Sequence, residues 1–91
     1  MIPQLEPETI SLRDRVRDKI RAHAGISLEG SNLSDSADLY EAGMTSHASV
    51  MLMLALENEF CLEFPDSMLS RNVFESVDAI CSAIVTLQED L

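Results

Sequence analysis

The sequence predicts a single all-α domain with three main helices, one short helix and a long first loop. Hydrophobic residues make up 46% of the 91 residues, but there is no Trp, one Tyr and three Phe, so the core must be aliphatic and Met-rich. Apolar residues recur at helical spacing in separate segments. A Ser or Thr precedes two of these segments, where it can cap a helix. We expect residues 1–7 to form a flexible N-terminus and residues 8–88 to form the helical bundle.

The first helix is predicted from about Glu8 to Ala24. Its apolar residues Leu12, Val16, Ile20 and Ala24 recur at every fourth position, which is typical of an amphipathic helix. Gly25 should end the helix, because glycine readily adopts the left-handed conformation that commonly follows the last residue of a helix. The polar side of this helix, which should face solvent, carries five bases: Arg13, Arg15, Arg17, Lys19 and Arg21.

Residues 26–44 form a long connection that contains two Gly, four Ser and one Asn. A structured loop of this length inside a compact domain is usually functional. Its acids Asp35, Asp38 and Glu41 lack the alternating oxygen ligands of a calcium loop, so we expect no metal there. Apolar residues spaced along the loop should hold it against the core: Ile26, Leu28, Leu33, Leu39 and Tyr40.

The second main helix should begin at Thr45–Ser46 and end near Phe60. Gly43 allows the chain to turn sharply just before it, and Ser and Thr are preferred helix caps. The segment VMLMLAL is apolar on nearly every side, which predicts a central helix.

The end of this helix should be exposed at Glu57 and Glu59. A domain this small cannot bury every face of an apolar helix, so part of the surface should remain for a partner or cargo. Met51 and Met53 fit core packing and partner contact equally well.

The last third of the chain should contain a short helix and a final long one. Residues 62–65 should be extended, because the residue before Pro avoids the helical region. Asp66 can then cap a short turn of helix that runs to Leu69. Ser76 should cap the last helix, and Asp78 is placed favourably against its dipole. The apolar stripe of that helix comprises Val77, Ile80, Cys81, Ile84, Leu87 and Leu91.

The formal net charge of −10 limits the kinds of partner. Residues 22–91 contain twelve acids and a single base, Arg71. Such a surface repels phosphate backbones and anionic lipids, so we expect neither nucleic acid nor membrane as a partner. It favours proteins with basic patches, although the acidity could serve solubility alone.

The remaining global features predict a monomer in the cytoplasm. We expect no signal peptide in the first ten residues, because they lack a basic segment followed by an apolar stretch. The longest apolar run, Val50–Leu56, is far too short to span a bilayer. Cys61 and Cys81 lie in hydrophobic surroundings without metal-ligand spacing. Free, partly buried thiols in a reducing compartment are the simplest interpretation.

Ser46 is the residue to which the pattern assigns chemistry. A serine where a helix begins lies among unpaired backbone N–H groups and the positive end of the helix dipole, which suits a phosphodiester. His47 projects to a different side of the helix, and nothing else resembles a general base, so a hydrolase is not supported. The alternative is that Ser46 only caps the helix.

The motifs around Ser46 extend along the chain. Residues 38–44 read D-L-Y-E-A-G-M, residues 45–47 read T-S-H, and residues 55–66 read A-L-E-N-E-F-C-L-E-F-P-D. This series resembles the acyl carrier protein family over residues 10–88. The family has an Asp-Ser-Leu triplet after D-L-x-x-x-G-x, and then A-L-E-x-E-F-x-x-x-(I/F)-P-(D/E). The resemblance implies an acyl-carrier-protein-like four-helix bundle. It also implies that a phosphopantetheinyl transferase moves 4′-phosphopantetheine from coenzyme A to Ser46.

Departures from the family pattern point to a subgroup. Thr45 replaces the usual Asp, His47 replaces the usual Leu, and Ala48 and Met51 stand where acids are common. The start of the helix is therefore neutral and partly apolar, and its partners should differ from those of fatty-acid synthase. These features resemble the stand-alone aminoacyl carrier proteins, which are charged by amino acid:carrier protein ligases that are similar to seryl-tRNA synthetases.

The resemblance implies that an ATP-dependent ligase loads an amino acid onto the thiol of the arm as a thioester, for a downstream acceptor enzyme. The chain itself would contribute no catalytic residue. Acyl cargo for fatty-acid, polyketide or peptide-synthetase chemistry remains an alternative, as does an acidic helical adaptor without a prosthetic group. The candidates for partner docking are Met44, Thr45, His47, Ala48, Met51, Glu57, Glu59 and Glu63.

Overall fold

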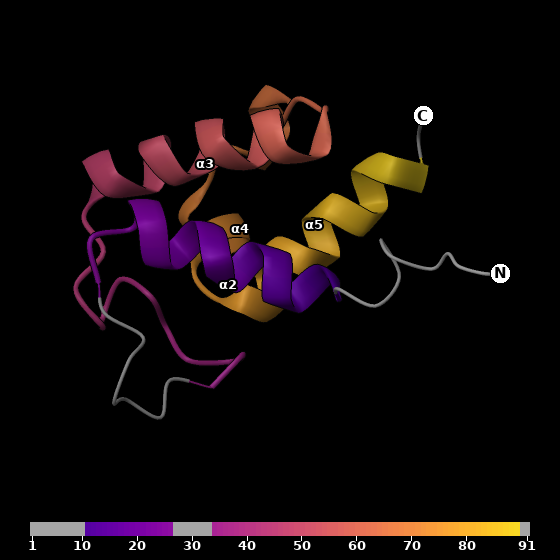
Figure 1. Ribbon diagram of the computed structural model, residues 1–91. Coiled ribbons are helices and arrows are strands. Elements are labelled where there is room, and N and C mark those ends of the chain that lie inside the picture. Colours follow the sequence, from indigo (N-terminus) through magenta and orange to yellow (C-terminus); the bar gives the residue numbers. More distant parts are fainter. Residues whose placement is uncertain (1–10, 27–33, 90–91) are drawn as a thin grey trace, which may run out of the picture.

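The computed structural model describes residues 11–26 and 34–89, and every regular element in these ranges is helical. Helix α2 lies against both α3 and α5, and α4 lies against α5 (Figure 1). The predicted all-α fold is confirmed. The proposed flexible N-terminus, Leu28, Leu33 and Leu91 lie outside the described residues. The elements are α2 (Leu12–His23), α3 (Ser46–Phe60), the 3₁₀ turn η1 (Asp66–Met68), α4 (Arg71–Phe74) and α5 (Val77–Glu89).

Helix α2 begins at Leu12, later than the predicted start at Glu8. The reason is that Ser11 is extended, with ψ 157°, and its hydroxyl accepts a hydrogen bond from the backbone N–H of Asp14 at 3.1 Å. A side chain that accepts such a bond fixes the first turn of a helix. At the other end Gly25 has φ +75°, which confirms the predicted left-handed stop.

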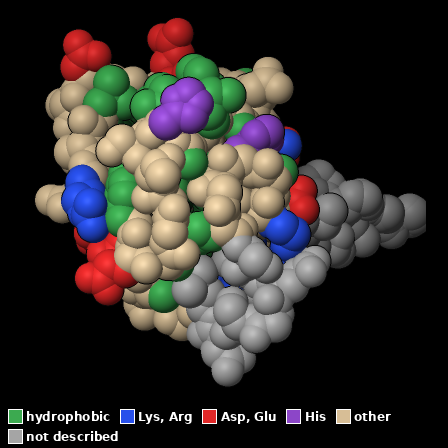
Figure 2. Space-filling view, turned by 90° about the vertical axis from the view of Figure 1, so that its left-hand side faces the viewer, with side chains coloured by type: hydrophobic (Ala, Val, Ile, Leu, Met, Phe, Trp, Pro, Cys, Tyr) green, Lys and Arg blue, Asp and Glu red, His purple; other side chains and the backbone are tan. Residues whose placement is uncertain are grey.

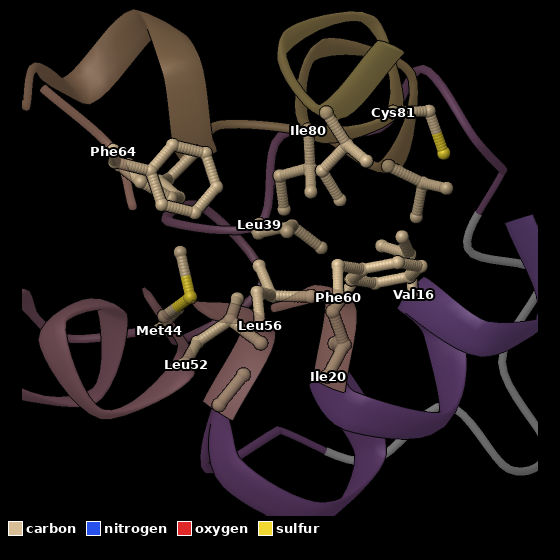
Figure 3. Close-up of a cluster of buried hydrophobic side chains, with 14 of the residues drawn as sticks. Val16, Ile20, Leu39, Met44, Leu52, Leu56, Phe60, Phe64, Ile80 and Cys81 are labelled. Carbon is tan, nitrogen blue, oxygen red and sulfur yellow. The ribbon is translucent and has the colours of Figure 1, made fainter. Parts of the chain in front are cut away.

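The core lies where the three main helices meet (Figure 3). Val16 and Ile20 of α2 are fully buried, as is Leu39 from the loop. The backbone N–H of Leu39 donates to the carbonyl of Glu75 at 2.7 Å, so the loop is fastened to the turn before α5. This confirms that the loop is held against the core. The other fully buried large side chains are Leu52 and Leu56 of α3 and Val77, Ile80 and Ile84 of α5.

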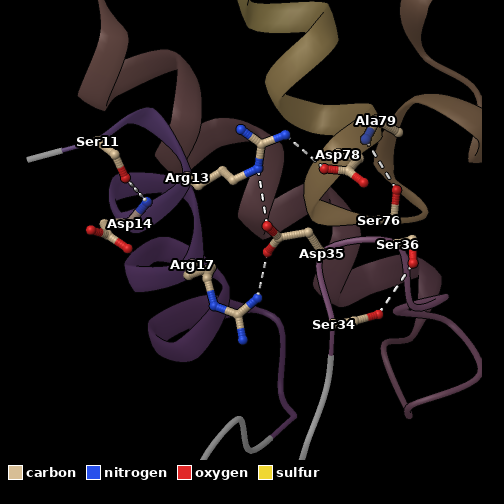
Figure 4. A network of polar contacts seen from close by, with 10 residues as sticks. All are labelled: Ser11, Arg13, Asp14, Arg17, Ser34, Asp35, Ser36, Ser76, Asp78 and Ala79. Atoms are coloured by element: carbon tan, nitrogen blue, oxygen red, sulfur yellow. Dashed lines mark hydrogen bonds and ion pairs between the residues drawn. The ribbon is translucent and has the colours of Figure 1, made fainter.

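Four of the five bases of α2 form ion pairs with other parts of the chain. Arg13 lies 3.0 Å from both Asp35 and Asp78, and Arg17 lies 2.8 Å from Asp35, so α2 is tied to the loop and to α5 (Figure 4). The prediction that all five bases face solvent is therefore confirmed for Arg13 and Arg21, which are exposed, and wrong for Arg15, Arg17 and Lys19, which are half-buried. Local spacing could not reveal these partners, because Asp35 and Asp78 are far from α2 in the sequence.

Two further bases of α2 meet α3 at one carboxylate. Arg15 and Lys19 lie 3.0 Å and 3.5 Å from the oxygens of Glu59, and the Arg15 guanidinium also covers the Phe60 ring at 4.4 Å. Nearby, a carboxylate oxygen of Glu57 accepts the backbone N–H of Phe64 at 2.9 Å. Both glutamates are half-buried. The expectation that Glu57 and Glu59 mark an exposed end is wrong, because their carboxylates hold the fold together.

We expect Glu59→Gln to lower the free energy of unfolding at neutral pH by up to about 1 kcal/mol, because it removes two partly exposed ion pairs. The hydrogen bond from Arg15 lowers the pKa of Glu59 in the folded protein. A group with a lowered folded pKa stabilises the fold above its unfolded pKa, and this stabilisation is lost as the pH falls through the folded pKa. Urea unfolding measured from neutral to acidic pH should therefore show a difference that vanishes in acid.

The matched control for that measurement is Glu63→Gln. Glu63 is exposed and forms no ion pair with residues 11–26 or 34–89. Its replacement should leave the free energy of unfolding nearly unchanged at every pH. A Glu59→Gln difference that persisted at low pH would contradict the electrostatic explanation.

The segment before α5 differs in detail from the prediction. Asp66 does not cap the short turn, because Pro65 occupies the cap position and no side-chain bond is made there. A further short helix, α4, follows and was not predicted. The Phe74 ring of α4 meets the Phe64 ring edge-on, with 5.1 Å between centroids, and this packing folds the segment back onto the core. The predicted cap of α5 is confirmed, because Ser76 Oγ accepts the N–H of Ala79 at 3.0 Å.

The two cysteines occupy different environments. Cys81 is buried, and burial raises the pKa of its thiol. Cys61 is exposed, and its φ of 55° ends α3 in a left-handed turn. Both thiols are free, as predicted, but the expectation that Cys61 is partly buried is wrong. Within the described residues, no helix combines the length and apolarity needed to cross a membrane.

Candidate attachment site at the start of helix α3

Thr45, and not Ser46, caps helix α3. The backbone of Thr45 is extended, and its side-chain hydroxyl accepts the N–H of Ala48 at 3.0 Å. Ser46 is the first residue within the helix and is exposed. The explanation of Ser46 as a plain cap is therefore wrong, and its hydroxyl does not have to serve the helix.

A fixed turn places Ser46. Gly43 has φ +122°, and a Cβ there would lie 3.2 Å from the side chain of Ile26, so both backbone conformation and space favour glycine. The N–H of Met44 donates to the carbonyl of Leu39 at 3.0 Å. Since Leu39 and Met44 are buried on the two sides of this turn, Ser46 emerges at a defined point of the surface.

The first turn of α3 can bind an anion. In the described ranges, 11–26 and 34–89, the backbone N–H groups of Ser46 and His47 have no hydrogen-bond acceptor, because the cap serves only Ala48. The first turn also contains no acidic residue. Free N–H groups and the positive end of the helix dipole favour a phosphate group. A phosphodiester on Ser46 Oγ therefore fits this site.

A cleft opens beside Ser46, between α3 and the segment that includes α4. Its volume is about 360 Å³. Its lining is mostly apolar or hydroxylic, and Arg71 supplies the only charge among the described lining residues. The cleft is lined by Tyr40, Ser46, Ser49, Val50, Met53, Leu69, Ser70, Arg71 and Phe74.

Next to the cleft, α3 presents an apolar face to solvent. Val50, Met51 and Leu54 are between 43% and 49% exposed, and exposed apolar side chains that lie together often mark an interaction site. Figure 2 looks at the end of the molecule where α3 begins, and it shows hydrophobic side chains gathered around a histidine. The prediction that part of this helix remains uncovered is confirmed. We call Val50, Met51 and Leu54 the α3 apolar face.

The predicted docking residues separate into two groups. Thr45, His47, Met51 and Glu63 are exposed and Ala48 is half-buried, so all five can be reached from solvent to some degree. Met44 is only 3% exposed and packs into the core, so its prediction as a docking residue is wrong. The sequence could not show that Met44 is buried, because a loop residue that packs into the core cannot be distinguished by local pattern from an exposed loop residue. Glu57 and Glu59 are occupied by the internal contacts described above.

Sequence reasoning missed Ser49, Val50, Leu54 and Arg71 as site residues. The first three belong to the apolar helix but could not be assigned to a face without its neighbours. Arg71 carried a signal, because it is the only base after position 21. Its proximity to the same cleft as Ser46 depends on α4, which the sequence did not reveal.

The geometry defines a class of protein: a small helical domain that exposes a serine hydroxyl where a helix can bind a phosphate group. Residues 14–84 match the family described as phosphopantetheine attachment site. The matched residues make up most of the chain, and the chain belongs to this family. Phosphopantetheine is therefore the prosthetic group of the family, as the sequence predicted.

One curated relative is similar to this chain over about half of its length. An aminoacyl carrier protein from Agrobacterium fabrum is 54% identical over 48 residues, which are 53% of this chain. The match spans 58% of the length of that relative.

Two solved structures are similar to this chain over most of its length. One is the structure of an engineered Bradyrhizobium japonicum glycine:[carrier protein] ligase complexed with a carrier protein from Agrobacterium tumefaciens and ATP. The matched chain of that structure is 36% identical to this one, with a TM-score of 0.78. The match covers 84% of this chain and 99% of the matched chain. The other is the B. japonicum ligase complexed with glycylated carrier protein, with 26% identity, a TM-score of 0.64, and coverage of 80% and 99%.

Proposed function

We propose that this chain is an aminoacyl carrier protein that bears 4′-phosphopantetheine on Ser46. The proposal depends on the observation that Thr45 caps α3, so the hydroxyl of Ser46 is not needed as a cap. This exposed hydroxyl lies beside the free backbone N–H groups of Ser46 and His47. When attached, the arm supplies a thiol that holds an amino acid as a thioester. The protein supplies a fixed point of attachment and surfaces for docking.

The chain is not itself an enzyme in this proposal. The described residues that line the cleft include no carboxylate and no histidine, so none can act as a general base toward Ser46 at neutral pH. Partner enzymes would therefore perform each reaction. These are a phosphopantetheinyl transferase that uses coenzyme A, an ATP-dependent amino acid:carrier protein ligase, and a downstream acceptor enzyme. We place these steps in the cytoplasm, where coenzyme A and ATP are supplied.

The ligase would dock on the start of α3. The α3 apolar face and the exposed Thr45 carry no ionisable group, so a ligase that meets them needs an apolar surface more than a basic one. The similarity to chains from complexes of glycine:[carrier protein] ligase supports a ligase of this kind. Glycine, which those complexes name, is the first cargo to test.

The test has two steps that intact-mass spectrometry can follow. Incubation of the unmodified protein with coenzyme A and a broad-specificity transferase should add the mass of one phosphopantetheine. Further incubation with ATP, glycine and a glycine:[carrier protein] ligase should add one glycyl group, which hydroxylamine should remove because it cleaves thioesters. A protein that stays unmodified with several transferases would contradict the proposal at its first step. A protein that takes the arm but accepts only fatty acyl groups would contradict the aminoacyl assignment.

A further inference from the structure

Arg71 is unusual among the cations of this chain. It is the only Lys or Arg after position 21, in a region with twelve acids, and it lines the same cleft as Ser46. The other arginines of the described ranges each lie 2.8–3.3 Å from a carboxylate oxygen. Arg71 lies 3.7 Å from the nearest oxygen of Asp38, which is too long for a hydrogen bond. Its guanidinium therefore makes no hydrogen bond within residues 11–26 and 34–89.

Its neighbours nevertheless hold Arg71 in place. The guanidinium carbon stacks over the Tyr40 ring, 4.1 Å from the ring centroid. Asp38 attracts it from one side, while the other oxygen of Asp38 accepts the N–H groups of Tyr40 and Glu41 at 2.9 Å and 3.3 Å. An arginine that is positioned in advance and retains its five N–H donors loses little entropy when an anion binds.

The arm would bring such an anion to the cleft. Its phosphodiester begins at Ser46 Oγ, and its charge must be accommodated on a protein with a net charge of −10. The free N–H groups of Ser46 and His47 can stabilise part of this negative charge. Arg71 is the one charged group among the described residues that line the cleft. Arginine suits phosphate oxygens particularly well, because two of its N–H groups can bind them side by side.

We infer that Arg71 binds the phosphodiester of the arm and directs the undocked arm into the cleft between α3 and α4. This inference rests on the proposed attachment at Ser46. Beyond the phosphate, Val50, Met53, Leu69 and Phe74 offer an apolar surface for the hydrocarbon part of the arm. The phosphate contact fixes the direction of the arm, and the cleft then shields the part that follows.

Amide chemical shifts of the unmodified and modified wild-type protein test this inference without any substitution. We expect modification to shift the amides of residues 69–74 as well as those next to Ser46, and high salt should reduce the distant shifts because it screens the contact. Shift changes confined to residues near 46 would overturn the inference. Intact-mass spectrometry before the shift measurement shows whether the arm is attached. Failure of the proposed attachment is therefore distinguished from failure of the Arg71 contact.

Arg71→Gln tests the residue itself. The shift differences at residues 69–74 between the unmodified and modified variant should largely disappear, and the phosphorus resonance of the phosphodiester should move toward that of free phosphopantetheine methyl ester. Arg21→Gln is the matched control: it removes the same charge, but Arg21 pairs with Asp18 and does not line the cleft, so the wild-type differences should persist. If the unmodified and modified Arg71→Gln protein differed at residues 69–74 as much as the wild type does, the inference would be overturned. The wild-type comparison remains decisive if this variant proves less well folded.

Discussion

Ser46→Ala is expected to abolish the addition of phosphopantetheine completely, while the free energy of unfolding stays within about 0.5 kcal/mol of the wild type. The modification requires the side-chain oxygen, which alanine lacks. The fold does not require it, because Thr45 makes the capping bond and Ser46 is exposed. Alanine is also favourable inside a helix. Intact mass after incubation with coenzyme A and a transferase measures the first effect, and urea unfolding measures the second.

Ser49→Ala is the matched control for this experiment. Ser49 lines the same cleft one turn further along α3, and its hydroxyl donates to the carbonyl of Ser46 at 2.7 Å. This variant should take up the arm in full, because the hydroxyl at position 46 remains. Modification of Ser46→Ala, or loss of modification in Ser49→Ala, would show that the attachment oxygen has been misassigned.

The second large effect concerns stability. Leu52→Ala should lower the free energy of unfolding by about 2–5 kcal/mol, because Leu52 is fully buried and its removal leaves a cavity in the core. Leu52 lies among the side chains from α2, α3 and the loop that meet at the centre of the bundle (Figure 3). For a domain of this size, such a loss is a large fraction of the total stability. Urea unfolding followed by circular dichroism provides the measurement.

Leu54→Ala supplies the control on the same helix. Leu54 is 49% exposed and belongs to the α3 apolar face, so its truncation should cost much less than that of Leu52. The same variant should weaken docking of the ligase, which would appear as a higher KM for the carrier. Equal destabilisation by the two substitutions would contradict the orientation of α3 described here.

The sequence predicted α3 well for physical reasons. The glycine turn, the hydroxyl cap and the apolar run are local signals, and α3 follows them from Ser46 to Phe60. The family motifs then pointed to Ser46, at the start of this helix, as the proposed attachment residue. What these signals could not settle was which of two adjacent hydroxyls caps the helix. That depends on the backbone at Thr45, where the extended conformation brings its oxygen to Ala48.

The errors concerned contacts between distant segments. Arg15 and Glu59 are 44 residues apart, so no local pattern shows that they form an ion pair. The short helix α4 has few helical signals of its own and follows from the packing of Phe74 against Phe64. The cleft, and with it the role of Arg71, depends on that packing. The exposed place of Ser46 at the start of α3 was therefore predictable, whereas its surroundings were not.

The pairing of the α2 bases has a consequence for diffusion. Each of these cations is balanced by a carboxylate a few ångströms away, so the pairs act as small local dipoles whose fields fade within a short distance of the surface. The field that an approaching basic enzyme meets at a distance is therefore set by the carboxylates that are not paired with these bases. The α3 apolar face carries no charge, so its own contacts with the enzyme can act only after that first encounter.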